Sequence, residues 1–270
     1  MLGSFTEACN AAIEAAAPLE ILYSDGAVVV VNKPSGLLVH RSPIDRHETR
    51  FAVQTLRDQL GRRVYPVHRL DKGTSGALAF ALDRDSAHAM AEAFASRRVV
   101  KTYLAVVRGW PDASGVVDHA LDTIRDAYAP AGDAEPKSAR TRYERLETVE
   151  LPHRVDRYPT ARYAMLRLEP ETGRRHQLRR HLAHVSHPII GDSTYGKGRH
   201  NRLFAELFGV RRLLLACTRI EFQHPATGQA LVVTASPGDE FEALARRFGW
   251  PWPAGSPCPE LSRPSTSPSR

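Results

Sequence analysis

An acidic residue inside a basic, glycine-rich segment is the first position of the sequence that could do chemistry. Asp71 lies in Val67–Gly76 (VHRLDKGTSG), ahead of a Gly-Thr-Ser-Gly turn and a strongly apolar run. We expect the turn to project the carboxylate into a cleft, with Arg69 and Lys72 keeping it ionised. Such a carboxylate can act as a nucleophile. The alternative is a loop aspartate that only caps its turn.

A second segment combines arginines and histidines at helical spacing. It is Thr172–His181 (TGRRHQLRRH), and the spacing predicts a helix with Arg175 and Arg179 on one face. Leu178 and Leu182 lie on another face and would pack against a sheet. The histidines of this region match no two-histidine-plus-carboxylate metal site, so we expect packing or phosphate-binding roles for His176, His181, His184 and His187.

A tyrosine leads a third segment, Lys101–Gly109 (KTYLAVVRG). Tyr103 alternates with Ala105 and Val107, so its ring shares their face of a strand. The ring is either part of the core, with its hydroxyl hydrogen-bonded, or a stacking surface for a base that has left its helix.

Several other chemistries lack their usual sequence marks. The chain contains no Walker loop, no strand-linked GxGxxG and no GxSxG elbow. The three cysteines, Cys9, Cys217 and Cys258, are scattered, which fits free thiols in a reducing compartment and no zinc site. No apolar run approaches the ~18 residues of a membrane span, and the first residues do not form a secretory signal.

The charge of the chain is concentrated in one stretch. The 270 residues carry a formal net charge of +7. Nine basic residues and two acidic ones lie between Arg174 and Arg212, so this stretch alone has the same net charge as the whole chain. A concentrated basic patch favours a polyanionic partner such as nucleic acid. The alternative is a solvated face that only keeps the protein soluble.

The pattern of apolar residues predicts a single α+β domain on a mainly antiparallel sheet. We expect helices after Asp83, through the basic stretch and after Ser236. Residues 1–18 are expected to be an extension, 19–250 the domain, and 251–270 a disordered Pro/Ser-rich tail. The predicted strands are Ala27–Asn32, Ala77–Leu82, Tyr103–Val107, Tyr163–Leu168, Leu213–Ala216 and Ala230–Thr234.

Taken together and in this order, the three segments resemble the pseudouridine synthases of the RluA-type family. The resemblance covers roughly Leu19 to Trp250. HRLDKGTSG and TGRRHQLRRH are its most specific parts, and VNKPSGLLVHR and RRLLLACTRIEFQHP extend it at both ends. It implies a catalytic fold with a central, mainly antiparallel mixed sheet, flanking helices and a cleft across the sheet.

The resemblance also implies roles for particular residues. Asp71 takes the place of the catalytic aspartate, and Arg179 that of the arginine paired with it. Tyr103 takes the place of the active-site tyrosine that stacks on the target base and helps proton transfer. Arg69 matches an arginine that can fill the space left by a flipped base. The expected substrate-binding set, including the apolar pocket wall, is Arg69, Lys101, Arg175, Leu214 and Leu215. Ala216 is a departure, because many relatives have histidine there.

The expected function is therefore isomerisation of uridine to pseudouridine in RNA. Within the family, the resemblance favours the branch that acts on tRNA at position 65 of the T-stem. Isomerisation needs no redox change or energy input, so we expect no cofactor and no metal. A cytoplasmic monomer is expected. The alternatives are the same reaction on ribosomal RNA, a non-catalytic RNA-binding protein on this fold, and an aspartate-dependent hydrolase.

Overall fold

A computed structural model of the chain describes residues 17–41, 48–123 and 135–251. The expected N-terminal extension and C-terminal tail lie almost wholly outside these ranges, so the domain boundaries remain predictions. Cys9 and Cys258 also lie outside them, whereas Cys217 is a buried free thiol. No helix of the described part is long and apolar enough to cross a membrane.

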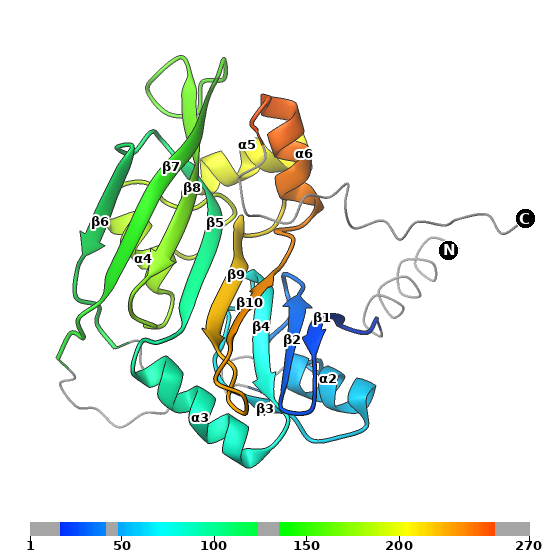
Figure 1. Cartoon of the computed structure of the whole chain (residues 1–270). Coiled ribbons are helices and arrows are strands. Elements are labelled where there is room, and N and C mark those ends of the chain that lie inside the picture. The colour runs from blue at the N-terminus through cyan, green and yellow to red at the C-terminus, as the bar shows by residue number, and fades with distance from the viewer. Residues whose placement is uncertain (1–16, 42–47, 124–134, 252–270) are drawn as a thin grey trace, which may run out of the picture.

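The described residues form ten strands and five helices (Figure 1). The strands are β1 (Glu20–Ser24), β2 (Val28–Lys33), β3 (Tyr65–Pro66), β4 (Ser75–Ala81), β5 (Val100–Arg108), β6 (Ser114–Asp118), β7 (Arg140–Leu151), β8 (Ala161–Pro170), β9 (Leu215–Gln223) and β10 (Ala230–Thr234). The helices are α2 (Ala52–Leu60), α3 (Arg84–Ala95), α4 (Gln177–His184), α5 (Gly198–Phe208) and α6 (Asp239–Phe248).

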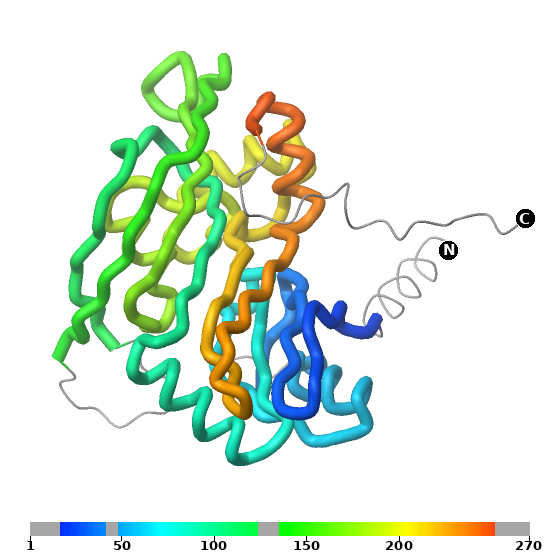
Figure 2. Tube along the Cα trace, viewed as in Figure 1, coloured from blue at the N-terminus to red at the C-terminus, as the bar shows by residue number. Residues whose placement is uncertain are grey.

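All strands belong to one mixed sheet with the order β1-β2-β4-β9-β5-β8-β7-β6, and β3 and β10 pair with β4 and β9. Every named pairing is antiparallel except β4 with β9, which is parallel and joins only Ser75 to Ala216 and Gly76 to Cys217. Figure 2 shows β9, late in the chain, lying between the early strands β4 and β5. The predicted α+β fold on a mainly antiparallel sheet is confirmed.

Alternation along β5 gives the sheet two different faces. Tyr103, Ala105 and Val107 belong to a core cluster that also contains buried residues of α2, α3 and α4. Leu104 and Val106 belong to a second cluster, with buried residues of α5 and α6. Because neighbouring strand residues point to opposite faces, α4 and α5 cover opposite faces of the sheet.

The predicted elements are present, with shifted bounds where local geometry differs from the pattern. The helix after Asp83 begins there because the Asp83 carboxylate accepts a hydrogen bond from the Ser86 N–H at 2.8 Å. The strand expected at Leu213–Ala216 begins at Leu215 and continues to Gln223. The helix of the basic stretch begins only at Gln177, because His176 has a left-handed backbone with φ 54°.

Candidate active site

Asp71 lies on the turn that enters β4. The Thr74 N–H donates to the Asp71 carbonyl at 3.0 Å, which closes the turn. The side chain of Asp71 is 17% exposed and lines a cleft. The expected ion-pair partners from its own segment are not there: Lys72 pairs with Glu48 at 2.5 Å, and Arg69 is exposed. A turn points neighbouring side chains in different directions, so closeness in sequence did not give closeness in space.

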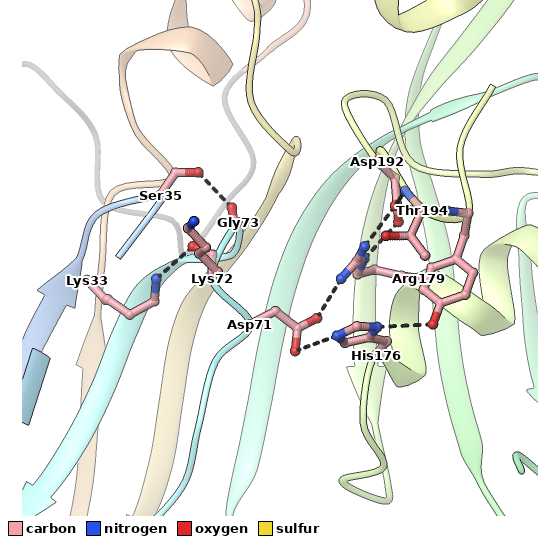
Figure 3. Close-up of polar contacts among 10 residues, drawn as sticks. Lys33, Ser35, Asp71, Lys72, Gly73, His176, Arg179, Asp192 and Thr194 are labelled. Carbon is pink, nitrogen blue, oxygen red and sulfur yellow. Dashed lines mark hydrogen bonds and ion pairs between the residues drawn. The ribbon is translucent and has the colours of Figure 1, made fainter. Parts of the chain in front are cut away.

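The charged partner of Asp71 comes instead from α4. Arg179 Nη1 lies 3.4 Å from Asp71 Oδ2, and Arg179 also donates two 2.8 Å hydrogen bonds to Asp192 (Figure 3). Burial lowers the pKa of Arg179, but the carboxylates of Asp192 and Asp71 outweigh it and leave the pKa raised. A guanidinium that is held in this way keeps its charge and direction beside Asp71.

A histidine faces the other oxygen of Asp71. His176 Nε2 lies 3.9 Å from Asp71 Oδ1, and His176 Nδ1 is 3.0 Å from the hydroxyl of Tyr195. Figure 3 shows the imidazole beside the Asp71 carboxylate. Tyr195 also lies under the Arg179 guanidinium, 5.1 Å from ring centroid to Cζ. One tyrosine therefore contacts both residues that face Asp71.

A buried lysine, Lys33, holds the backbone next to Asp71 by hydrogen bonds. Lys33 Nζ donates to the carbonyls of Pro34, Leu37 and Lys72, at 2.9, 2.7 and 3.2 Å. Burial lowers the pKa of Lys33 to about 7, although the charge of Asp71 raises it. The bond to the Lys72 carbonyl holds the peptide that joins Lys72 to Gly73, one residue beyond Asp71 (Figure 3).

Tyr103 is buried in the wall of the cleft and is 7% exposed. Burial, and then the adjacent Cys217 thiol and the charge of Asp71, raise the pKa of Tyr103 well above its usual range. Its phenol therefore keeps its proton at neutral pH. Lys101 also lines the cleft, with its ammonium 5.8 Å from the centroid of the Phe94 ring.

The cleft has a volume of about 640 Å³. Its described lining carries six basic side chains and two acidic ones, Asp71 and Glu171. Gln177 braces one wall, since its amide donates to the Arg140 carbonyl and accepts from the Thr172 hydroxyl. The basic residues are Arg69, Arg97, Lys101, Arg174, Arg175 and Arg179. This lining is suited to a phosphate-rich ligand whose reacting group reaches Asp71.

The structure brings most of the expected site residues together and corrects two expectations. Asp71, Tyr103, Arg179, Arg69, Lys101, Arg175 and Leu215 all line the cleft. Leu214 does not, because it lies in the second core cluster on the opposite face of the sheet, as does Ala216. Arg175 precedes α4 instead of sharing a helical face with Arg179, because the left-handed residue His176 intervenes.

The basic stretch does not form one surface. Arg174, Arg175 and Arg179 line the cleft, whereas α5, which carries Arg199 and Arg202, packs against the other face of the sheet. Arg212 points inward, and donates to the Ser75 hydroxyl and to Glu240. The cleft instead gains basic residues from elsewhere in the chain, including Arg97 after α3.

The four histidines singled out in the sequence, His176, His181, His184 and His187, have separate partners. His181 is fully buried, with its ring nitrogens bonded to the Thr141 hydroxyl and the His119 carbonyl. His184 stacks on His119, and His187 contacts the Arg108 carbonyl. Within the described ranges, no group of three His, Cys, Asp or Glu is arranged to hold a metal.

Sequence reasoning missed the supports of the site. Asp192, Tyr195 and Lys33 were not singled out, and His176 was expected to pack or bind phosphate. Asp192 meets Arg179 over 13 residues and Tyr195 meets His176 over 19, so no short motif contains these pairs. Asp192 is one of the two acidic residues of the basic stretch, and Lys33 lies in the segment VNKPSGLLVHR, but neither position indicates its partner.

Comparison with known proteins shows the family of this chain. Residues 27–184 match the model of a family described as RNA pseudouridylate synthase. The tRNA pseudouridine synthase C of Yersinia pestis is 50% identical over 236 residues, covering 86% of this chain and 91% of that protein. The Vibrio vulnificus (strain CMCP6) protein of that name is 48% identical over 237 residues, covering 86% and 96%.

A solved structure has the same fold. The human RNA Pseudouridylate Synthase Domain Containing 4 superposes with a TM-score of 0.63 at 28% identity, and the match covers 85% of this chain and 93% of that one. The resemblance inferred from the motifs is confirmed. A matching family model over more than half of the chain and relatives near half identity lead to one conclusion: the chain belongs to the RNA pseudouridylate synthase family.

Proposed function

We propose that the protein converts uridine to pseudouridine in tRNA, at position 65 of the T-stem, with Asp71 as the nucleophile. The names of the relatives at 48–50% identity support tRNA as the substrate. The observation that carries the proposed mechanism is Asp71 at a basic cleft, with one carboxylate oxygen 3.4 Å from Arg179. A binding protein for a polyanion gains nothing from a carboxylate in that place.

The reaction breaks the N1–C1′ bond, turns the uracil and joins C5 to C1′. An ionised carboxylate can hold the fragments together as a transient covalent adduct, and Arg179 orients Asp71 for that role. Addition at C6, attack at C1′ and elimination from C2′ remain alternative routes. No redox change or energy input occurs, so the proposal includes no cofactor.

The target base must leave its helix to reach the cleft. Unstacking costs a few kcal/mol, offset by stacking on an aromatic ring and by contacts to phosphates. We assign the stacking surface to Tyr103 and the apolar wall to Leu215, both of which line the cleft. Arg69, Lys101 and Arg175 supply charge at the cleft, and Arg69 fills the place of the flipped base. The enzyme acts as a monomer in the cytoplasm.

The test is release of tritium from unmodified tRNA labelled at uracil C5. Wild type should release it, and Asp71→Asn should not, while tRNA binding stays within about tenfold because the substitution leaves the basic surface intact. Mapping of the product then locates the modified uridine.

Other results have clear meanings. Collapse of binding in Asp71→Asn would assign Asp71 a structural role and contradict the nucleophile. Turnover of ribosomal RNA, with none of tRNA, would replace the substrate. Binding without turnover of either RNA would favour the non-catalytic function.

A further inference from the structure

Formation of pseudouridine requires a proton transfer that the nucleophile alone does not explain. When C5 becomes bonded to C1′, it still carries its hydrogen, and the ring lacks the hydrogen that N1 bears in the product. The C5 proton must leave to a base, and N1 must gain one. This step follows on every route to the adduct, so a base near the turned uracil is needed whichever route operates.

Few side chains of the cleft can accept that proton. The pKa of Tyr103 is raised well above its usual range by burial, so its phenol is already protonated. Lys101 and the arginines are donors while they carry their protons. His68 is half-buried, and its Nε2 already accepts a hydrogen bond from the Ala79 N–H at 2.9 Å. Glu171 already accepts hydrogen bonds from Arg140 and Arg142, at 3.3 and 2.6 Å. Asp71, the proposed nucleophile, and His176 remain among the described residues of the lining.

His176 has the geometry of a general base with an orienting partner. Its Nδ1 is 3.0 Å from the Tyr195 hydroxyl, which can accept as well as donate a hydrogen bond. With the proton on Nδ1, Nε2 is an acceptor on the side of Asp71, 3.9 Å from Oδ1 (Figure 3). When Nε2 takes a proton, the imidazolium lies beside a carboxylate, which stabilises the cation.

We propose that His176 is a catalytic residue that accepts the C5 proton on Nε2, with Tyr195 as its positioning residue. This role rests on the proposed function. The proton moves from C5 to Nε2 as the electrons of the C–H bond return to the uracil ring. The imidazolium then gives its proton to water, and N1 takes one from water, so the ring is isomerised with no net change in atoms or electrons.

The charges around His176 come from three parts of the chain and set its titration. Burial lowers the pKa of His176 below its ordinary 6.5, and Arg179 and Arg175 lower it further. Asp71 and Asp192 oppose them, and Tyr195 bonds to Nδ1. The imidazole is therefore neutral at pH 7 and able to accept. Activity should rise with pH through this pKa, below neutrality, since only the deprotonated form is a base.

His176→Gly tests the role without straining the backbone. Glycine adopts the φ of 54° freely, so removal of the side chain should leave the fold intact. Because general base catalysis contributes roughly 10²–10⁴-fold, we expect turnover to fall by about 100-fold or more, and free imidazole to restore at least about tenfold of it. The acidic limb of the pH profile should then follow the pKa of the added imidazole.

Two further variants are measured beside His176→Gly: one is a control for the backbone change, and the other tests Tyr195. Ser186→Gly removes another non-glycine residue with a positive φ, 65°, outside the cleft lining, and should be fully active and unaffected by imidazole. Tyr195→Phe keeps the ring and removes only the hydroxyl, so kcat should fall by about tenfold with little change in KM, because the base loses its orientation.

The outcomes separate this role from the proposed function. His176→Gly that retains kcat within about threefold would overturn it. So would a folded His176→Gly that is inactive with imidazole present and keeps the wild-type acidic limb in its residual activity. Wild type without activity on any RNA would instead refute the proposed function. Melting temperatures show whether each variant is folded.

Discussion

Arg179 lies between the carboxylates of Asp192 and Asp71. Its two hydrogen bonds to Asp192 fix the direction of the guanidinium group that faces Asp71. Asp192 is 2% exposed, and it also accepts the backbone N–H groups of Thr194 and Tyr195, at 2.9 and 3.0 Å. Burial raises the pKa of Asp192, but the bonds from Arg179 and from these two N–H groups outweigh it and leave the pKa lowered. Asp192 is thus a buried anion that positions Arg179.

Removal of that anion should lower both stability and activity. Asp192→Asn leaves a buried guanidinium with one charged partner fewer, and breaking a buried pair costs about 3–5 kcal/mol. We expect a loss of this order in urea unfolding at pH 7, and a fall in kcat larger than the rise in KM. Asp122→Asn, which removes the exposed partner of Arg180, is the control and should cost about 0.5 kcal/mol or less.

The lowered pKa of Asp192 predicts how the difference in stability between wild type and Asp192→Asn depends on pH. A carboxyl group whose pKa is lowered by folding stabilises the protein above its unfolded pKa, and this stability is lost as the pH falls through the folded pKa. The gap in unfolding free energy between wild type and Asp192→Asn should therefore narrow below the ordinary carboxyl pKa of 3.8. A gap that stays constant from pH 7 to pH 3 would contradict this role of Asp192.

At the scale of elements, the position of each helix decides which arginines can meet RNA. Arg174 lies in the loop before α4, and Arg97 follows α3, and both line the cleft. Arg199 and Arg202 belong to α5, which packs on the other face of the sheet. Net charge along the sequence does not distinguish these two pairs.

Salt dependence of tRNA binding distinguishes them. Each lost phosphate contact reduces the slope of log K against log salt by roughly one unit or slightly less. Replacing Arg97 and Arg174 together by alanine should lower the slope by about two and weaken binding. The Arg199→Ala, Arg202→Ala double variant removes the same charge and is the control, with the slope unchanged. A larger effect of the α5 pair would place the RNA on that face.

The elements that were predicted and those that were missed differ in their local signals. Asp83 caps α3 with its side chain, and its helix was expected. The helices α2 and α5, which were not predicted, follow Phe51 and Lys197, and neither residue provides a side-chain cap. The helices α4 and α6 also lack a side-chain cap, but the spacing of their apolar residues predicted them. The strand β7 was missed because it is largely charged, with ten of its twelve residues not buried. The three short motifs gave most of the cleft lining: Thr172–His181 contributes eight lining residues, Val67–Gly76 six and Lys101–Gly109 two.

At the scale of the molecule, the sheet is held together at one narrow point. The parallel contact between β4 and β9 joins two residue pairs, and Gly76 is one of them. A Cβ on Gly76 would lie 2.1 Å from the Cys217 carbonyl oxygen, and the φ of Gly76 is +105°. No side chain fits there without moving one strand away from the other.

Gly76→Ala should therefore destabilise the protein by more than about 4 kcal/mol, as few single substitutions do. Gly61→Ala is the matched control: its φ is +63° with open space around it, so it should cost only about 1–2 kcal/mol of backbone strain. The midpoint of urea unfolding measures both. If the two variants proved equally stable, the contact between β4 and β9 would not limit stability.

The position of β9 between β4 and β5 also affects how the protein folds during its synthesis on the ribosome. Asp71 and Arg179 are synthesised well before residues 215–223, yet β4 has no neighbour towards β5 until those residues emerge. Pairings this distant in sequence close slowly, because the intervening chain must first be ordered. A nascent chain therefore carries Asp71, His176 and Arg179 before it has the strand that lies between β4 and β5, and the sheet that positions them is complete only after residues 215–223 emerge.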